Sequence, residues 1–132
     1  MKLTRQKIGM LFLIGLALLF FGFAWYLGPL PQDVHYHSFA DSRRFFAIPN
    51  TLNVLSNLAF VLVGLWGIRQ FNDNDSTTLI LLALGSALIG LGSAYYHWAP
   101  DNQTLLWDRL PMSLTFMALF SLVVSEFISR NV

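Results

Sequence analysis

The sequence predicts an all-α fold, a polytopic membrane bundle with four transmembrane helices. Of the 132 residues, 55% are hydrophobic and only 11% are charged, whereas soluble domains usually carry about 25% charged residues. The charged residues gather between long apolar runs. These runs approach the roughly 20 residues that a helix needs to cross a bilayer.

Composition also excludes several kinds of site and partner. The chain has no cysteine, so disulfides and cysteine-based metal or redox centres are excluded. A formal net charge of +1 provides no basic surface for nucleic acid. The expected partners are therefore the membrane and its lipids.

The first predicted helix lies within an N-terminal membrane segment, residues 1–28. Three cations and no acid precede an uncharged run over residues 8–28. A signal peptide also begins with a basic region, but its apolar core is only about 7–15 residues long and ends at a small-residue cleavage site. This run is longer and ends in Trp25 and Tyr26, which are typical of an interface anchor. An uncleaved membrane helix is therefore favoured.

Residues 29–50 are predicted to form a polar interfacial segment, because Pro29 and Pro31 end the first helix and charges follow. The second helix is expected over residues 51–68, with Asn50 or Thr51 as its cap. Polar side chains at helical spacing are predicted to point into the bundle and bond to other helices. They are Asn50, Asn53, Ser56 and Asn57.

Two more helices complete the expected bundle. Over residues 77–96, Ser86, Gly90 and Ala94 recur every four residues, a seam of small side chains that lets helices approach closely. The last helix is expected over residues 105–128, with Pro111 early in it.

Cations predict the orientation of the bundle. Five lie at one end, namely Lys2, Arg5, Lys7, Arg69 and Arg130, and three at the other, namely Arg43, Arg44 and Arg109. The positive-inside rule therefore predicts a cytoplasmic N-terminus. Short loops place a polar cluster at the opposite face, comprising His35, His37, Asp41, Ser93, His97 and Asp108.

Ser93, His97 and Asp108 are the candidate site residues. His97 is one helical turn beyond Ser93, so the two share a face about 6 Å apart along the axis. Three chemistries fit: a zinc site that generates hydroxide, an aspartate that orients the histidine or acts as a base, or a Ser–His–Asp triad. The triad is disfavoured because a serine one turn from its base is poorly placed for proton transfer.

Structural roles stay open for the same residues. Ser93 can bond to its own backbone, and His97 can belong to an interfacial aromatic belt. Asp108 can pair with Arg109 or stabilise a helix N-terminus.

Ser93-x-x-x-His97, followed by WDRLPM at residues 107–112, resembles the signature of the alkaline ceramidase family. PNTLNVLSNL at residues 49–58 is similar to the start of that family's first core helix. The family belongs to a superfamily of seven-helix membrane hydrolases that includes adiponectin-receptor-like proteins and lipid remodelling proteins. The resemblance covers about residues 35–120. It implies that residues 51–132 are a partial ceramidase-like core, its first three helices, after one leading helix.

The resemblance also implies roles for the three residues. His97 would be a zinc ligand, Asp108 would activate the zinc-bound water, and Ser93 would support the metal site or the developing oxyanion. The implied reaction hydrolyses a ceramide-type lipid, drawn from the bilayer, to a sphingoid base and a fatty acid. The alternatives are a lipid-ester hydrolase of the same superfamily and a catalytically silent fragment that binds lipid or a partner.

Two features depart from the family's pattern. The family's other two zinc-binding histidines lie on an HxxxH-type segment of the last helix that this sequence lacks. The chain is therefore expected to be a truncated piece, to associate with a separate C-terminal half or a second copy, or to have lost the site. His35 and His37 do not match that motif and are expected at the surface. Asp41 is the candidate calcium ligand, but Asn50 stands where an acid is expected, so calcium has less support than zinc.

Overall fold

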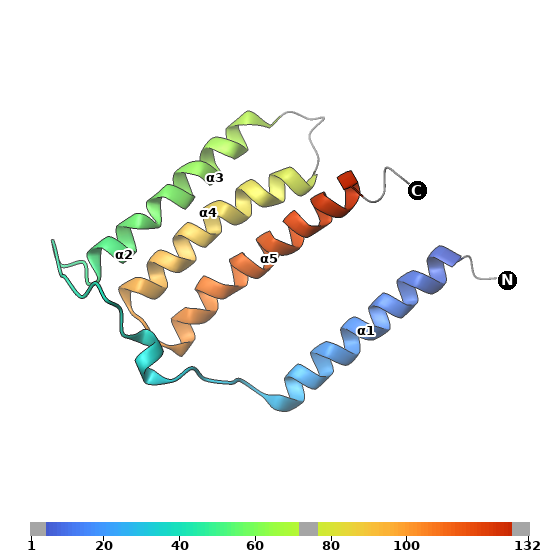
Figure 1. Ribbon diagram of the computed structural model, residues 1–132, viewed down its shortest axis with the longest axis horizontal. Helices are drawn as coiled ribbons and strands as arrows, with labels where there is room; N and C mark the ends of the chain where they lie inside the picture. Colours follow the sequence, from blue (N-terminus) through green and yellow to red (C-terminus); the bar gives the residue numbers. More distant parts are fainter. Residues whose placement is uncertain (1–4, 72–76, 128–132) are drawn as a thin grey trace. The chain divides into compact units, whose positions relative to one another are not determined.

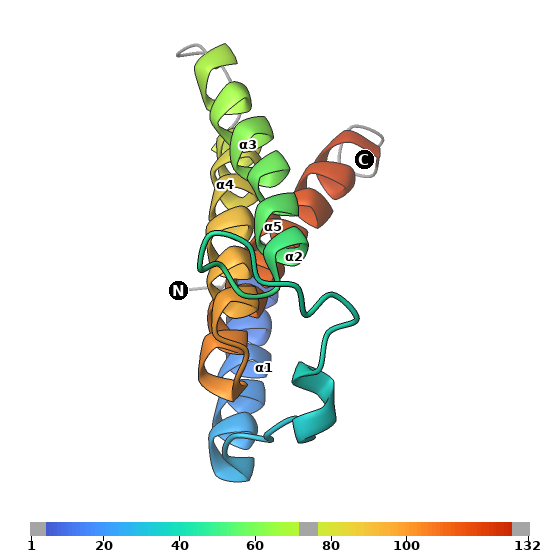
Figure 2. The ribbon, with the colours of Figure 1, turned by 90° about the vertical axis from the view of Figure 1, so that its left-hand side faces the viewer.

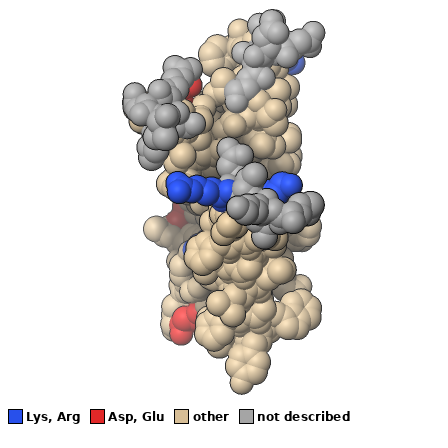
Figure 3. All heavy atoms as spheres, turned by 90° about the vertical axis from the view of Figure 1, so that its right-hand side faces the viewer, with Lys and Arg blue, Asp and Glu red and all other residues tan. Residues whose placement is uncertain are grey.

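The computed structural model describes residues 5–71 and 77–127, and the regular elements within these ranges are helices. The all-α prediction is therefore confirmed. Within the described residues, four helices are long and apolar enough to cross a membrane, over Lys7–Leu27, Thr51–Gln70, Thr77–Trp98 and Asn102–Phe127. On the face that Figure 3 shows, uncharged residues cover most of the described surface. The chain divides into two compact units, Met1–Gln32 and Asp33–Val132, and the division falls inside the predicted polar segment.

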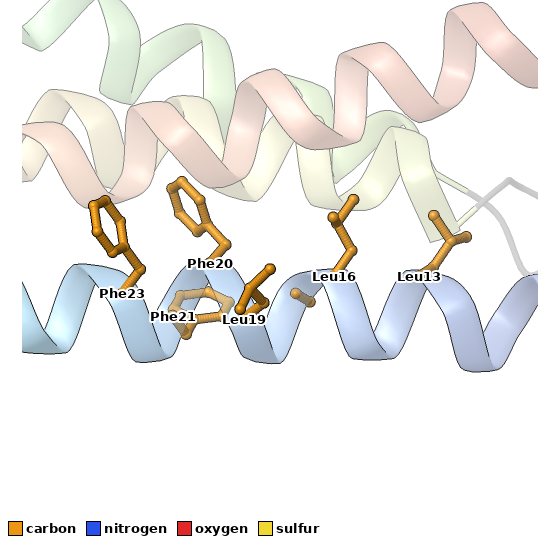
Figure 4. Close-up of a pocket in the computed structure, with 7 residues that line it drawn as sticks. Leu13, Leu16, Leu19, Phe20, Phe21 and Phe23 are labelled. Atoms are coloured by element: carbon orange, nitrogen blue, oxygen red, sulfur yellow. The ribbon is translucent and has the colours of Figure 1, made fainter.

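The first unit contains one helix, α1, Arg5–Leu27. Large apolar side chains are exposed all round it, and Figure 4 shows Leu13, Leu16, Phe20 and Phe23 projecting from one side. A helix that is apolar on every side is typical of a membrane span. It ends where the prolines predict, at Gly28, whose φ of +69° suits a helix C-terminus.

The second unit contains the other three membrane-length spans, the first of which is divided into two helices. Its elements are a short 3₁₀-helix η1 (Val34–His37), α2 (Thr51–Ser56), α3 (Leu58–Gln70), α4 (Thr77–Trp98) and α5 (Asn102–Phe127). Helix α4 lies between α3 and α5 and packs against both (Figure 1). The start of α2, the end of α4 and the start of α5 therefore meet at one end, where η1 also lies (Figures 1 and 2).

Helix α4 uses small residues to approach α3, as its four-residue seam predicts. A β-carbon at Gly90 would lie 2.7 Å from the carbonyl oxygen of Asn57 on the facing span. The Ser86 hydroxyl donates a 3.3 Å hydrogen bond to the carbonyl of Phe60. This contact is therefore made largely between backbones, which only small side chains permit.

A second close approach joins α4 to α5 and was not predicted from the sequence. A β-carbon at Gly85 would overlap the Thr115 hydroxyl, and one at Gly92 would overlap the carbonyl of Trp107. The two glycines are seven residues apart, so they share a face two turns apart. Helix α4 therefore has small-residue contacts with both neighbours.

The second predicted span is interrupted at Asn57, and the expected inward polar stripe is partly wrong. The Asn57 amide donates to the Asn53 carbonyl at 2.7 Å, and the Ser56 hydroxyl donates to the same carbonyl at 3.0 Å. Ser56 is exposed, not inward. Asn50 does bond to another helix, because its amide donates to the His97 carbonyl at 2.9 Å.

Helix α5 begins at Asn102, earlier than its predicted start at residue 105. The Asp101 carboxylate caps it, because one oxygen accepts from the backbone N–H groups of Gln103 at 2.8 Å and Thr104 at 2.7 Å. Pro111 consequently lies inside the helix and not near its start. Because proline has no N–H, the carbonyl four residues before it, that of Trp107, loses its helical partner. Phe127 is the last described residue of α5, so the predicted end at residue 128 lies outside the described part.

Candidate functional site

The candidate site lies where α4 ends and α5 begins. Ser93 is buried near the end of α4, with His97 half-buried one turn later, and the Asp108 side chain on α5 is 13% exposed. Gly92 packs against the backbone of Trp107 and Asp108. Ser93 directly follows Gly92, and Asp108 directly follows Trp107. Ser93 and Asp108 therefore lie at the same depth on facing helices.

His97 has an unusual ring environment. Its Nδ1 is buried and has no hydrogen-bond partner, although buried polar atoms are paired in the large majority of cases. The Phe39 ring packs on it with 4.5 Å between ring centroids. Asp108 is close enough to act electrostatically on His97 and Tyr96. This nitrogen therefore lacks the partner that a bound ligand could supply.

Asp108 is not held by a short ion pair. The Arg109 Nε lies 3.9 Å from its carboxylate, and the Arg109 side chain is 52% exposed. Arg109 instead donates to the Tyr36 hydroxyl of η1 and places its guanidinium 5.7 Å from the centroid of the Tyr36 ring. The predicted Asp108–Arg109 pair is present only at long range, so Arg109 does not hold the Asp108 carboxylate in a close ion pair.

His37 is half-buried and its ring lies against Tyr96, so it is less exposed than expected, whereas His35 is exposed. The His37 Nδ1 is 2.9 Å from the Tyr96 hydroxyl, and its Nε2 is buried without a partner. Sequence reasoning also missed Tyr96, which is only 3% exposed. The available signal was the tyrosine itself, because a buried tyrosine hydroxyl usually needs a hydrogen-bond partner.

Asp41 caps α2 in place of the predicted Asn50 or Thr51. Its Oδ2 accepts from the backbone N–H of Leu52 at 3.0 Å, and its Oδ1 accepts from the Arg43 Nε at 2.5 Å. The Arg43 hydrogen bond holds the pKa of Asp41 below its usual value. Asn50 makes no capping bond, and the Thr51 hydroxyl bonds to the preceding turn. Both oxygens of the calcium candidate thus have protein partners.

The described residues fit part of a zinc site. His97 suits one ligand position, because its Nδ1 is buried and unpartnered, and Asp108 lies nearby. Catalytic zinc usually takes three protein ligands. Within residues 5–71 and 77–127, no group of three histidine, aspartate or glutamate side chains is arranged to hold a metal. These residues therefore do not complete a zinc site.

Comparison with known families gives one match. Residues 45–132 match the protein-family model described as Ceramidase. The match covers more than half of the chain and includes Ser93, His97 and Asp108, whereas α1 and η1 lie outside it. No curated protein and no solved structure matched the chain.

Proposed function

The chain belongs to the ceramidase family, and from this membership we propose that it is a membrane-embedded, zinc-dependent amidohydrolase of ceramide-type lipids. The lipid enters from the bilayer and leaves as a sphingoid base and a fatty acid. The observation that carries this proposal is the match over residues 45–132, because it contains Ser93, His97 and Asp108. Their position at the junction of α4 and α5 supports the assignment.

Asp108 is the proposed base. In amide hydrolysis a water oxygen bonds to the carbonyl carbon, the carbon–nitrogen bond breaks, and the nitrogen takes up a proton. The Asp108 carboxylate accepts the proton of the attacking water and passes it to the leaving amine. Its low side-chain exposure of 13% supports this role, and so does its 3.9 Å separation from the Arg109 Nε, because the carboxylate is not held in a close ion pair.

His97 is proposed as one zinc ligand, with its other ligands outside the described residues. The buried, unpartnered Nδ1 supports this assignment. When bound, zinc supplies Lewis-acid chemistry that lowers the pKa of water and polarises a carbonyl oxygen. Ser93 is proposed to hold this region in place or to donate its hydroxyl to the developing oxyanion.

The test uses the purified full-length protein in lipid nanodiscs. Mass spectrometry follows the sphingoid base released from a ceramide, and metal analysis gives the zinc content. We expect Asp108→Asn to keep its zinc and to lose about 10²- to 10⁴-fold in hydrolysis, the usual contribution of a general base. We expect His97→Ala to lose zinc. His35→Ala is a control at an exposed histidine before the core.

Three results would contradict parts of this proposal. Undiminished turnover by Asp108→Asn would exclude Asp108 as the base. An unchanged zinc content in His97→Ala would remove the ligand assignment. Release of fatty acid from ester lipids but not from ceramides would favour the lipid-ester hydrolase instead.

A further inference from the structure

A second unpartnered histidine nitrogen lies in the same aromatic cluster as His97. The cluster comprises His37, Phe39, Tyr96 and His97, whose neighbouring ring centroids are 4.5 to 5.8 Å apart. Within it, both the His37 Nε2 and the His97 Nδ1 are buried without a hydrogen-bond partner. Buried polar atoms normally have a hydrogen-bond partner. Each of these two nitrogens can therefore still accept or donate one hydrogen bond.

Two attachments fix the position of the His37 ring. Its Nδ1 bonds to the Tyr96 hydroxyl at 2.9 Å, and the preceding residue, Tyr36, is held by Arg109 of α5. The Asp33 carboxylate also caps η1 by accepting from the His35 N–H at 2.8 Å. The position of the His37 ring is therefore fixed by hydrogen bonds to α4 and α5.

The hydrogen bond to Tyr96 limits what the Nε2 can bind. If the Tyr96 hydroxyl donates to Nδ1, the Nε2 carries the proton and donates. If Nδ1 carries the proton, the Nε2 accepts. A ligand hydroxyl satisfies either tautomer, because it both donates and accepts, whereas a carbonyl oxygen or an ammonium group satisfies only one.

We propose that the Nε2 of His37 binds a hydroxyl group of the lipid's sphingoid base, with Tyr96 orienting the ring. This inference rests on the proposed function, because ceramide-type lipids carry hydroxyls on the carbons next to the amide-bearing carbon. Tyr96 directly precedes His97, so an amide held at His97 and Asp108 brings these neighbouring hydroxyls toward His37. His37 thus selects lipids with a hydroxylated base and is a binding residue that takes no part in bond cleavage.

The test measures lipid binding without turnover. Full-length protein carrying Asp108→Asn is placed in nanodiscs and titrated with a ceramide, its 1-deoxy analogue and its 3-deoxy analogue. We expect His37→Phe to weaken ceramide binding about five- to tenfold, the worth of one hydrogen bond. We expect no further weakening for the deoxy analogue that lacks the recognised hydroxyl.

Matched variants separate binding from folding. His35→Phe, at the exposed histidine two residues earlier, is expected to bind all three lipids as the parent does. Tyr96→Phe keeps the aromatic packing but loses the bond that orients His37, so a smaller loss confined to the same hydroxyl is expected. His37→Gln retains an amide that can bond to a hydroxyl, and partial recovery is expected.

Three outcomes would overturn the inference: equal weakening for all three lipids in His37→Phe, no weakening for any of them, or no ceramide binding by the parent. Hydrolysis by the wild-type protein is measured separately. Hydroxyl-dependent binding through His37 without hydrolysis would contradict the proposed function alone. Hydrolysis that is indifferent to His37 would contradict this inference alone.

Discussion

Gly92 of α4 lies so close to the carbonyl oxygen of Trp107 on α5 that a β-carbon at position 92 would overlap it. That carbonyl is the one that Pro111 leaves without its helical partner. The contact sets how closely the helix that carries Ser93 and His97 approaches the helix that carries Asp108. A glycine and a proline, neither of them polar, therefore position the candidate site.

Gly92→Ala is expected to destabilise the protein by about 1–3 kcal/mol, the usual cost of adding a methyl group where there is no space. Its melting temperature in detergent should fall, and hydrolysis should fall with it because Asp108 is displaced. Gly15→Ala is the matched control, since a β-carbon at Gly15 meets nothing within 4 Å. A melting temperature for Gly92→Ala equal to that of the wild type would show that the helices separate without cost.

Asn50 is expected to tolerate glycine better than alanine. Its backbone has a φ of +46°, and its amide donates to the His97 carbonyl at 2.9 Å. Asn50→Ala loses a hydrogen bond worth about 0.5–1.5 kcal/mol and places a less suitable residue in the left-handed region, at about 1–2 kcal/mol. Asn50→Gly loses only the hydrogen bond. Thermal unfolding of both variants checks this order, and equal losses would argue against the backbone contribution.

Low pH is expected to weaken the cap of α5. The pKa of Asp101 lies below its usual value, mainly because its carboxylate accepts a hydrogen bond from the backbone N–H of Thr104. A carboxyl whose folded-state pKa is lowered stabilises the fold fully above its unfolded-state pKa, about 3.9. That stability is lost as the pH falls through the folded-state value. The melting temperature should therefore be insensitive to this group near pH 6 and should decline below about pH 4.

Substitution at Asp101 isolates its share of that decline. Asparagine is also a good N-cap, so Asp101→Asn should match the wild type near neutral pH and decline less steeply in acid. Asp101→Ala should melt at a lower temperature even at neutral pH, because the bonds to Gln103 and Thr104 are gone. Parallel pH profiles for the wild type and Asp101→Asn would assign the acid sensitivity to other groups.

Orientation in the membrane is testable with single cysteines, because the chain has none. With a cytoplasmic N-terminus, Ser42→Cys should react with a membrane-impermeant maleimide on intact cells, and Gln70→Cys should react only after lysis. Both side chains are exposed in the structure. The reverse labelling pattern would place the N-terminus outside. The cations Lys2 and Arg130, which contribute to this prediction, lie outside the described residues.

The helices were predictable because a bilayer imposes a simple rule. A chain that crosses hydrocarbon must satisfy its backbone polar groups internally, so long apolar runs become helices. Boundaries were less predictable where a side chain acts at short range. Asp101 starts α5 early, and Asp41 caps α2 from a position ten residues before the helix. Neither bond follows from apolar periodicity.

By itself, the sequence determined the all-α class, the four apolar spans and the placement of Ser93, His97 and Asp108 at one end of two consecutive spans. All of these depend on run length and on the helical repeat. Only the tertiary structure decided three contacts. His37 bonds to Tyr96, and Arg109 donates to the Tyr36 hydroxyl. Gly92 packs against the carbonyl of Trp107. The physical reason is sequence separation. Contacts between residues far apart in the chain depend on how the polar segment before α2 folds back over the ends of α4 and α5, and no local periodicity encodes that path.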